Sequence, residues 1–142
     1  MEILLGSDHA GFDLKEACKG YLQSRPEYKV VDMGVHDRAS VDYPEVAHRV
    51  AQAMVRGEFD RGILICGTGL GMSMVANRYK GVRAALCHNL YTVKMSRLHN
   101  DANILAMGGR VIGSGLALEM VELFLQTPFE GGRHQRRLDQ MD

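Results

Sequence analysis

The sequence predicts an α/β fold, namely a three-layer α/β/α sandwich with a five-stranded, mainly parallel sheet. The first observation is that short apolar runs, such as residues 63–65, show no polar–apolar alternation, which is typical of strands covered on both faces. The second is that a polar turn and a segment with helical spacing of apolar residues tend to follow these runs. Strands alternating with helices predict right-handed crossovers and helices on both faces of the sheet.

The composition is that of an ordinary globular chain. Its 142 residues suit a single domain over residues 1–142, with an arginine-bearing C-terminal segment at about 129–142. Basic and acidic residues number 17 each, so the net charge favours neither nucleic acid nor a membrane surface as a partner. The three cysteines form no disulfide or metal pattern, and we see no targeting segment or spanning apolar run. We therefore expect a cytoplasmic protein with reduced thiols.

The first half of the chain supplies two strand–helix units. A strand at residues 3–5 is followed by a helix over about 14–22, whose apolar residues repeat at helical spacing. A second strand at 29–31 precedes a helix for which Asp42 and Glu45, three residues apart, predict a capping box.

The second half continues this alternation. The strand at 63–65 enters a glycine-rich turn and a helix, and further strands are expected at 82–87 and 104–107. A helix around 91–98 separates these last two strands. A long helix with an apolar stripe follows Ser114 and ends near Pro128.

The stretch Cys-Gly-Thr-Gly-Leu-Gly at residues 66–71 is the centre of the functional argument. Its glycines let the backbone turn sharply and approach a ligand, and the helix start that follows directs free N–H groups and a positive dipole end at the same point. This combination predicts an anion site with the thiol of Cys66 and the hydroxyl of Thr68 at its mouth. A helix N-terminus also favours the thiolate form of a nearby cysteine.

Three known glycine loops do not fit this stretch. A dinucleotide-binding loop would follow the first strand; Asp32 provides the acid expected after the second strand, but the first turn, Gly-Ser-Asp-His-Ala-Gly, lacks the glycine pattern. A P-loop requires lysine after its last glycine, and a cysteine-phosphatase loop requires arginine six residues after the cysteine; both positions are Met72. A turn that only redirects the chain remains the alternative.

Parallel sheets bind ligands outside the carboxyl ends of their strands. This rule gathers six side chains at one edge, because each follows a predicted strand: Asp8, His9, Cys66, Thr68, Cys87 and His88. Cys87 and Cys18 are interpreted as buried packing residues.

The remaining polar candidates lie elsewhere in the sequence. His99 precedes the fifth strand beside Asn100, where an imidazole could act as an acid or base near neutral pH, although a surface histidine at a helix end is the alternative. Arg133 and Arg137 would share one helix face and could bind one phosphate, although charged C-terminal helices are common.

The contexts of three further histidines are typical of surface positions and indicate no role: His36, His48 and His134.

Several motifs together resemble one family across nearly the whole chain. They are Gly-Ser-Asp-His-Ala-Gly-Phe at 6–12, Asp-Tyr-Pro at 42–44, Ile-Cys-Gly-Thr-Gly-Leu-Gly at 65–71, Ala-Asn at 76–77, Ser-Arg and His-Asn-Asp-Ala-Asn within 96–103, and Gly-Arg-His-Gln at 132–135 with Arg137. This set resembles the ribose-5-phosphate isomerase B family, which also includes galactose-6-phosphate isomerase subunits. Cysteine at 66, without a glutamate at 72, resembles the branch that uses cysteine as its base.

The resemblance implies a Rossmann-like homodimer or dimer of dimers with shared active sites and neither metal nor organic cofactor. It would interconvert D-ribose 5-phosphate and D-ribulose 5-phosphate, a step of the pentose phosphate pathway, through ring opening and a cis-enediolate. The alternatives are an allose or galactose 6-phosphate isomerase of the same family, or a non-catalytic sugar-phosphate sensor. A nicotinamide-dependent oxidoreductase would rest on Asp32 alone.

The resemblance also implies a role for each matching residue. Cys66 would be the base between C1 and C2, with Thr68 assisting proton movement at the hydroxyls. The amides of the turn formed by Gly67, Gly69 and Gly71 would hold the enediolate oxygen.

A second implied group handles the ring and the phosphate. His99 would open the furanose ring, with Asp8 as a further catalytic residue. Asp8 and Tyr43 would lie near the ring oxygens, and Asn100 beside them. The implied phosphate ligands are His9, Arg110, Arg133 and Arg137. His99, Asn100 and Arg110 are further expected to face the Cys66 pocket of a partner copy.

Overall fold

A five-stranded sheet, with all strands parallel, forms the centre of the computed structural model, which describes residues 1–142. The strands lie in the order β2-β1-β3-β5-β4. Their bounds are β1 (Glu2–Ser7), β2 (Lys29–Asp32), β3 (Arg61–Cys66), β4 (Ala84–Leu86) and β5 (Ile104–Gly108). The predicted fold class is therefore confirmed, and the sheet is wholly rather than mainly parallel.

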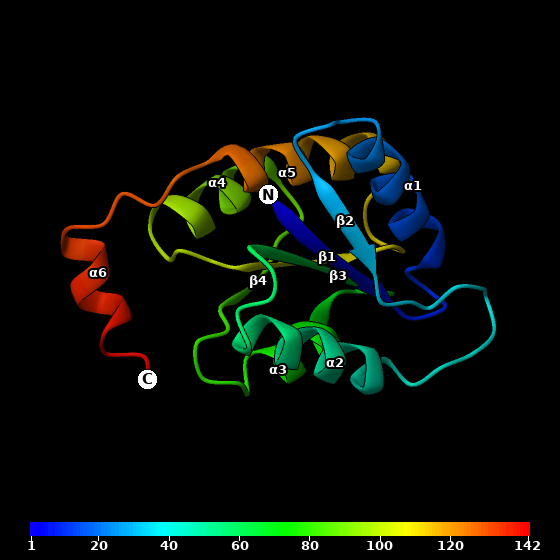
Figure 1. Ribbon diagram of the computed structural model, residues 1–142, viewed down its shortest axis with the longest axis horizontal. Helices are drawn as coiled ribbons and strands as arrows, with labels where there is room; N and C mark the ends of the chain where they lie inside the picture. The colour runs from blue at the N-terminus through cyan, green and yellow to red at the C-terminus, as the bar shows by residue number, and fades with distance from the viewer.

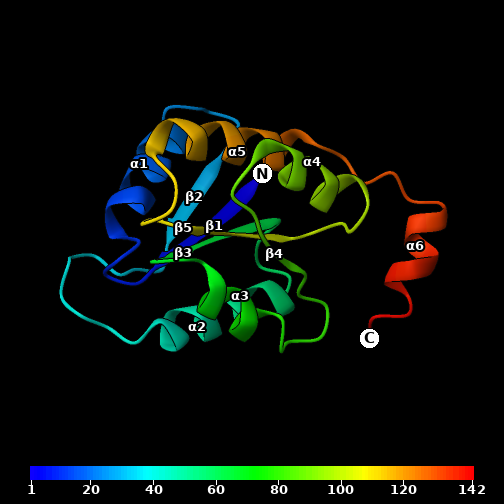
Figure 2. The same ribbon diagram turned by 180° about the vertical axis from the view of Figure 1, so that it is seen from behind.

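Helices cover both faces of the sheet (Figures 1 and 2). The layer on one face consists of α1 (Phe12–Gln23), α4 (Leu90–Leu98) and α5 (Ser114–Gln126). The layer on the other face consists of α2 (Tyr43–Val55) and α3 (Leu70–Ala76). A sixth helix, α6 (Arg133–Leu138), stands apart from both layers near the C-terminus (Figure 1).

The apolar runs of the sequence are buried on both sides, as their lack of alternation predicts. In β1, Ile3 and Leu5 pack under α1 and α5, whereas Leu4 between them packs under α2. All three side chains are fully buried. Strand β3 is buried on both faces in the same way, and its last residue, Cys66, lies at the carboxyl edge of the sheet.

The edge strand β4 is shorter than the predicted 82–87. It pairs only with β5, from Ala84 opposite Ile104 to Leu86 opposite Ala106, and it is half-buried throughout. At its start, the N–H of Arg83 donates to the side chain of Asn103 at 2.8 Å instead of to a second strand.

The predicted capping box at the start of α2 is wrong. Asp42 is the N-cap residue, but its side chain accepts no hydrogen bond from the helix. Its carbonyl oxygen instead accepts the N–H of Glu45 at 3.2 Å. Pro44 lies in the first turn, where its fixed φ is already suited to a helix.

The chain between α5 and α6 turns back toward the end of α4. The N–H of Glu130 donates to the carbonyl of Leu98 at 3.1 Å. Gly131 and Gly132 follow with φ of 70° and 56°, values that glycine adopts without strain. These contacts hold α6 at the end of the molecule opposite the carboxyl ends of the strands (Figures 1 and 2). No helix combines the length and apolar character needed to cross a membrane.

Candidate active site

Asp8 and Cys66 lie side by side because β1 and β3 are neighbours in the sheet. Ser7 is paired with Ile65 across the two strands, and the N–H of Asp8 donates to the Ile65 carbonyl at 3.2 Å. Both side chains are buried, with exposures of 6% for Asp8 and 5% for Cys66. Strand β2 lies on one side of β1 and β3 on the other, so the direction in which strands are added reverses between β1 and β3. Parallel sheets bind ligands in the crevice outside the strand ends at such a reversal.

The turn after Cys66 requires glycine for steric reasons. Gly69 has a φ of 79°, and a Cβ there would lie 2.6 Å from Leu86 Cδ1 and 2.9 Å from the backbone carbon of Met107. The left-handed turn brings the N–H of Gly69 to 3.1 Å from the Sγ of Cys66.

Free amides and a hydroxyl surround this sulfur. The N–H groups of Gly67 and Thr68 have no hydrogen-bond acceptor within the chain. The Thr68 side chain is exposed at the edge, and its Oγ1 accepts the N–H of Leu70 at 3.3 Å. The predicted combination of thiol, hydroxyl and unpaired amides is therefore present at one point.

Tyr43 and Arg110 border the turn. The ring of Tyr43, the first residue of α2, lies 2.5 Å from the place where a Cβ on Gly71 would sit. The Nη1 of Arg110 lies 3.3 Å from the corresponding place on Gly67, and the Arg110 N–H donates to the Gly67 carbonyl at 3.0 Å. An aromatic hydroxyl and a guanidinium thus border the same edge.

Asp8 and His9 complete this edge. The Oδ1 of Asp8 accepts the N–H of Gly11 at 3.0 Å, which fixes the turn before α1. The Nδ1 of His9 accepts the N–H of Val41 at 3.2 Å. In the neutral imidazole the proton therefore resides on Nε2, where it is available to an anion.

The remaining predicted residues lie at the opposite edge of the sheet. His99 ends α4 and Asn100 follows it, just before the amino end of β5. Arg133 and Arg137 both lie on the short helix α6, as predicted, and both are exposed. Because β5 spans five residues at ~3.3 Å each, about 16 Å separates the two edges.

One chain therefore holds the predicted site residues in two separate groups, one with Cys66 at the carboxyl edge and one with His99 at the amino edge. None of the cavities of about 420, 400, 390 and 220 Å³ is lined by Cys66. The cavity of about 400 Å³ lies at the amino edge and is lined by Asn100 and Leu138 among others. Arg110, which was expected to face another copy's turn, adjoins Gly67 of its own chain with both its backbone and its side chain.

A buried arginine anchors the loop that carries His99. Arg97, only 2% exposed, donates from Nη1 to Asp101 at 2.8 Å and to the Ala102 carbonyl at 2.6 Å. Its Nε donates to the Thr127 carbonyl at 3.1 Å. Arg97 therefore joins the loop before β5 to the segment after α5.

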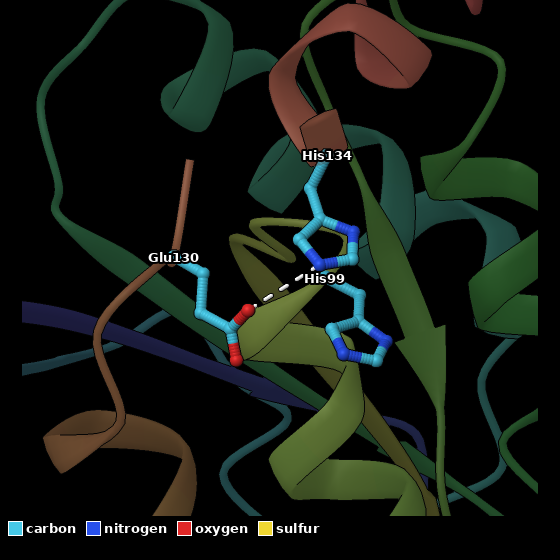
Figure 3. Close-up of side chains that lie close together, drawn as sticks. All are labelled: His99, Glu130 and His134. Carbon is cyan, nitrogen blue, oxygen red and sulfur yellow. Dashed lines mark ion pairs between the residues drawn. The ribbon is translucent and has the colours of Figure 1, made fainter. Parts of the chain in front are cut away.

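His134 was expected at the surface, and this prediction is wrong. The residue is 5% exposed, and its ring stacks on His99 with centroids 4.2 Å apart and planes 14° apart (Figure 3). Its Nε2 lies 3.3 Å from a carboxylate oxygen of Glu130. The one sequence signal is the spacing of four between Glu130 and His134, which is weak because a short helix begins between them.

The other two cysteines have the packing roles predicted for them. Cys18 is fully buried, and burial raises the pKa of its thiol to about 12. Burial also raises the pKa of Cys87, against hydrogen bonds with Thr92 and Ser96 that lower it. Both thiols are therefore neutral near physiological pH.

Asp32, the acid that a dinucleotide site would need, is already occupied. Its carboxylate accepts hydrogen bonds from Lys15 at 2.6 Å, Lys19 at 2.9 Å and the N–H of Gly34 at 2.8 Å. Lys15 is fully buried. This network links α1 to β2 and leaves the carboxylate no role in holding a ribose.

The fold and this edge define an α/β protein in which a thiol, a carboxylate and free amides gather at the carboxyl ends of the parallel strands. The model of the ribose/galactose isomerase family matches residues 3–141. The chain therefore belongs to the ribose/galactose isomerase family.

Individual relatives agree with this assignment over more than nine tenths of their lengths. Ribose-5-phosphate isomerase B of Escherichia coli is 46% identical over 138 residues, which are 97% of this chain and 92% of that protein. The ribose-5-phosphate isomerase B structure from Clostridium thermocellum has a TM-score of 0.97 at 52% identity, with 99% and 95% coverage. The structure of the Thermotoga maritima enzyme has a TM-score of 0.96 at 51% identity, with 99% and 97% coverage.

Proposed function

We propose that this chain is an aldose–ketose isomerase that interconverts D-ribose 5-phosphate and D-ribulose 5-phosphate. The single observation that carries the proposal is the sulfur of Cys66 beside Gly69 and the free amides of Gly67 and Thr68. A proton next to a carbonyl can be removed only if a base and a means of holding the resulting oxyanion are present together. Relatives named for this reaction, at 46% to 52% identity, support the choice of sugar.

The Cys66 thiolate removes the proton from C2 of the open-chain aldose. The electron pair of that C–H bond forms the C1=C2 double bond, and the negative charge passes to O1. The amides of the turn between Gly67 and Gly71 hold this oxygen, and Thr68 transfers a proton between O2 and O1. Return of a proton from Cys66 to C1 gives the ketose.

The rate enhancement divides between these groups. General acid–base catalysis by Cys66 accounts for about 10² to 10⁴ in rate. The remainder is assigned to the oxyanion contacts and to the fixed position of the sugar.

His99 opens the furanose ring before this step. It takes the proton of the C1 hydroxyl and delivers one to the ring oxygen, while the bond between C1 and that oxygen breaks. Asp8, Tyr43 and Asn100 orient the sugar hydroxyls. The phosphate is bound by His9, Arg110, Arg133 and Arg137.

We propose that two copies assemble each site as a homodimer or a dimer of dimers. The support is the distance of about 16 Å between the two edges, since a five-carbon sugar phosphate cannot bridge it within one chain. The Cys66 edge of one copy then receives His99 and Asn100 of another. Arg133 and Arg137 come with them on α6, and Arg110 stays with its own Cys66.

The location that we propose is the cytoplasm, where sugar phosphates are metabolised. The three cysteines are free thiols, which fits a reducing compartment.

The test is an isomerase assay with a panel of sugar phosphates. We expect turnover of ribose 5-phosphate, with lower kcat/KM on allose 6-phosphate and galactose 6-phosphate. A preference for a six-carbon sugar would instead identify the chain as an allose or galactose 6-phosphate isomerase. Saturable binding without turnover or proton exchange into deuterated water would make it a sensor.

A further inference from the structure

His134 lies in a position that no part of the proposed reaction explains. The residue is buried, yet its Nε2 has no hydrogen-bond partner, since the Glu130 carboxylate at 3.3 Å is poorly aligned with it. Its ring covers one face of His99 (Figure 3). His99 itself is only half-buried at the end of α4.

Two connections hold this ring against His99. The N–H of Glu130 bonds to the Leu98 carbonyl, which ties the linker to the residue just before His99. The N–H of His134 donates to the Gly131 carbonyl at 3.1 Å, which closes the first turn of α6 and fixes His134 relative to the linker. The stack is thus fixed from both the linker and the helix.

His99, Glu130 and His134 are also residue types that bind zinc, and their ligand atoms lie within 4.8 Å of one another. A bound metal lies close to the plane of each ligating imidazole. The two rings are stacked with centroids 4.2 Å apart and planes only 14° apart, so no point lies in the plane of both rings at a metal–nitrogen distance. The arrangement favours an orienting contact over a metal site.

We propose that His134 is a positioning residue for His99. Its ring, held near Glu130, fixes the plane of the His99 imidazole so that one edge meets the sugar during ring opening. This inference rests on the proposed function, in which His99 carries out that step. It assigns His134 no contact with the substrate.

The chemistry of the two substrates separates this role from a structural one. Ribulose 5-phosphate stays open-chain, because its phosphate occupies the hydroxyl that would close a furanose ring on C2. Exchange of its C1 proton with deuterated water therefore requires Cys66 but no ring opening. Consumption of ribose 5-phosphate requires both ring opening by His99 and proton transfer by Cys66.

The experiment measures both rates for the wild type and three variants. His134→Ala should lower ribose 5-phosphate turnover by ~10²-fold, the cost of misplacing a catalytic group by about 1 Å. Its deuterium exchange into ribulose 5-phosphate should change less than about two-fold. His134→Phe, which keeps a flat ring over His99, should restore most of the turnover.

Leu138→Ala is the matched control. Leu138 is the other buried residue of α6 and is not part of the stack. Its loss should loosen the helix that carries Arg133 and Arg137 and raise KM for both sugar phosphates equally, with no selective loss of kcat on ribose 5-phosphate.

Several outcomes would overturn the proposal. Equal loss of turnover and exchange in His134→Ala, or no rescue by His134→Phe, would reduce the residue to a packing role. Stoichiometric Zn²⁺ binding that competes with a chromophoric chelator, and is lost in Glu130→Gln and His134→Ala, would make the cluster a metal site. A wild type without activity on either sugar would instead contradict the proposed function, which keeps the two failures distinct.

Discussion

At the scale of the residue, Cys66 differs from the other two cysteines in what its sulfur contacts. The sulfur accepts the N–H of Gly69, whereas burial raises the pKa of the Cys18 and Cys87 thiols. Only the thiolate is a strong nucleophile.

We therefore expect iodoacetamide at pH near 8 to modify Cys66 first, with loss of activity in step with modification. Peptide mass spectrometry identifies the site, and ribose 5-phosphate should slow the reaction. Cys18, whose pKa is raised to about 12, should stay unmodified until the chain unfolds. Earlier modification of Cys18 or Cys87 would refute this order.

Alanine substitutions at two glycines of the turn should have different effects, one on stability and one on substrate binding. Alanine at Gly69 must adopt a φ of 79° against the fixed backbone of Met107, which costs at least ~1–3 kcal/mol in unfolding free energy. The three atoms nearest to an added Cβ at Gly71 all belong to the side chain of Tyr43, which is 40% exposed and can therefore shift toward solvent.

Gly71→Ala should consequently fold almost as stably as the wild type but raise KM, since the Tyr43 ring is displaced from the edge. Urea unfolding and initial rates measure the two effects. Equal stability of the Gly69→Ala and Gly71→Ala variants would contradict the structural argument.

At the scale of the element, the contact between α1 and β2 depends on a charged network. Lys15 is fully buried and bonded to Asp32, so removal of the carboxylate leaves a buried charge with only Glu16, at 3.2 Å, as its partner. Burial raises the pKa of Asp32, but hydrogen bonds from Lys15, Lys19 and Gly34 outweigh it and lower the pKa overall.

Asp32→Asn should lower the unfolding free energy by about 3 kcal/mol, the low end of the range for one partner of a buried pair. Addition of Lys15→Met should recover much of this loss, because it removes the unpaired charge. Urea denaturation of the single and double variants measures both. A double variant no more stable than Asp32→Asn would contradict the buried-charge account.

The depressed pKa also predicts a pH dependence. The carboxylate stabilises the native state fully above its unfolded pKa of ~3.9, and this stabilisation disappears as the pH falls through the lower native value. Wild-type stability should fall more steeply on acidification than that of Asp32→Asn, as measured by urea midpoints between neutral and acidic pH. Parallel curves would argue against this linkage.

The sequence predicted elements well where one local pattern determined them. Strands such as β1 and β5 were found because apolar runs without alternation require cover on both faces. The bounds of β4 and the cap of α2 were missed because neighbours decided them: Asn103 receives the Arg83 N–H, and Pro44 starts the helix without a side-chain cap.

The candidate site divides in the same way. The carboxyl-edge residues were predictable, because consecutive parallel strands bring their ends together. The burial of His134 was not, because it depends on a turn at Gly131 and Gly132 that brings the first residues of α6 beside His99, which is distant in the sequence.

At the scale of the whole molecule, the arrangement of the two edges is the main finding. Cys66 and the glycine turn lie at the carboxyl ends of the strands, whereas His99 and the arginines of α6 lie at the amino ends (Figures 1 and 2). No local sequence pattern reports how one copy meets another. The central claim is therefore that a complete site needs two chains.

The most direct test is complementation between two inactive variants. Cys66→Ala and His99→Ala chains, carrying different affinity tags, are mixed under conditions that exchange subunits, and the heterodimer is isolated. A symmetric dimer with shared sites then contains one site with both changes and one intact site. We expect the heterodimer to recover turnover of ribose 5-phosphate with the wild-type KM. A verified heterodimer no more active than its two parents would show that each chain works alone and would contradict the claim.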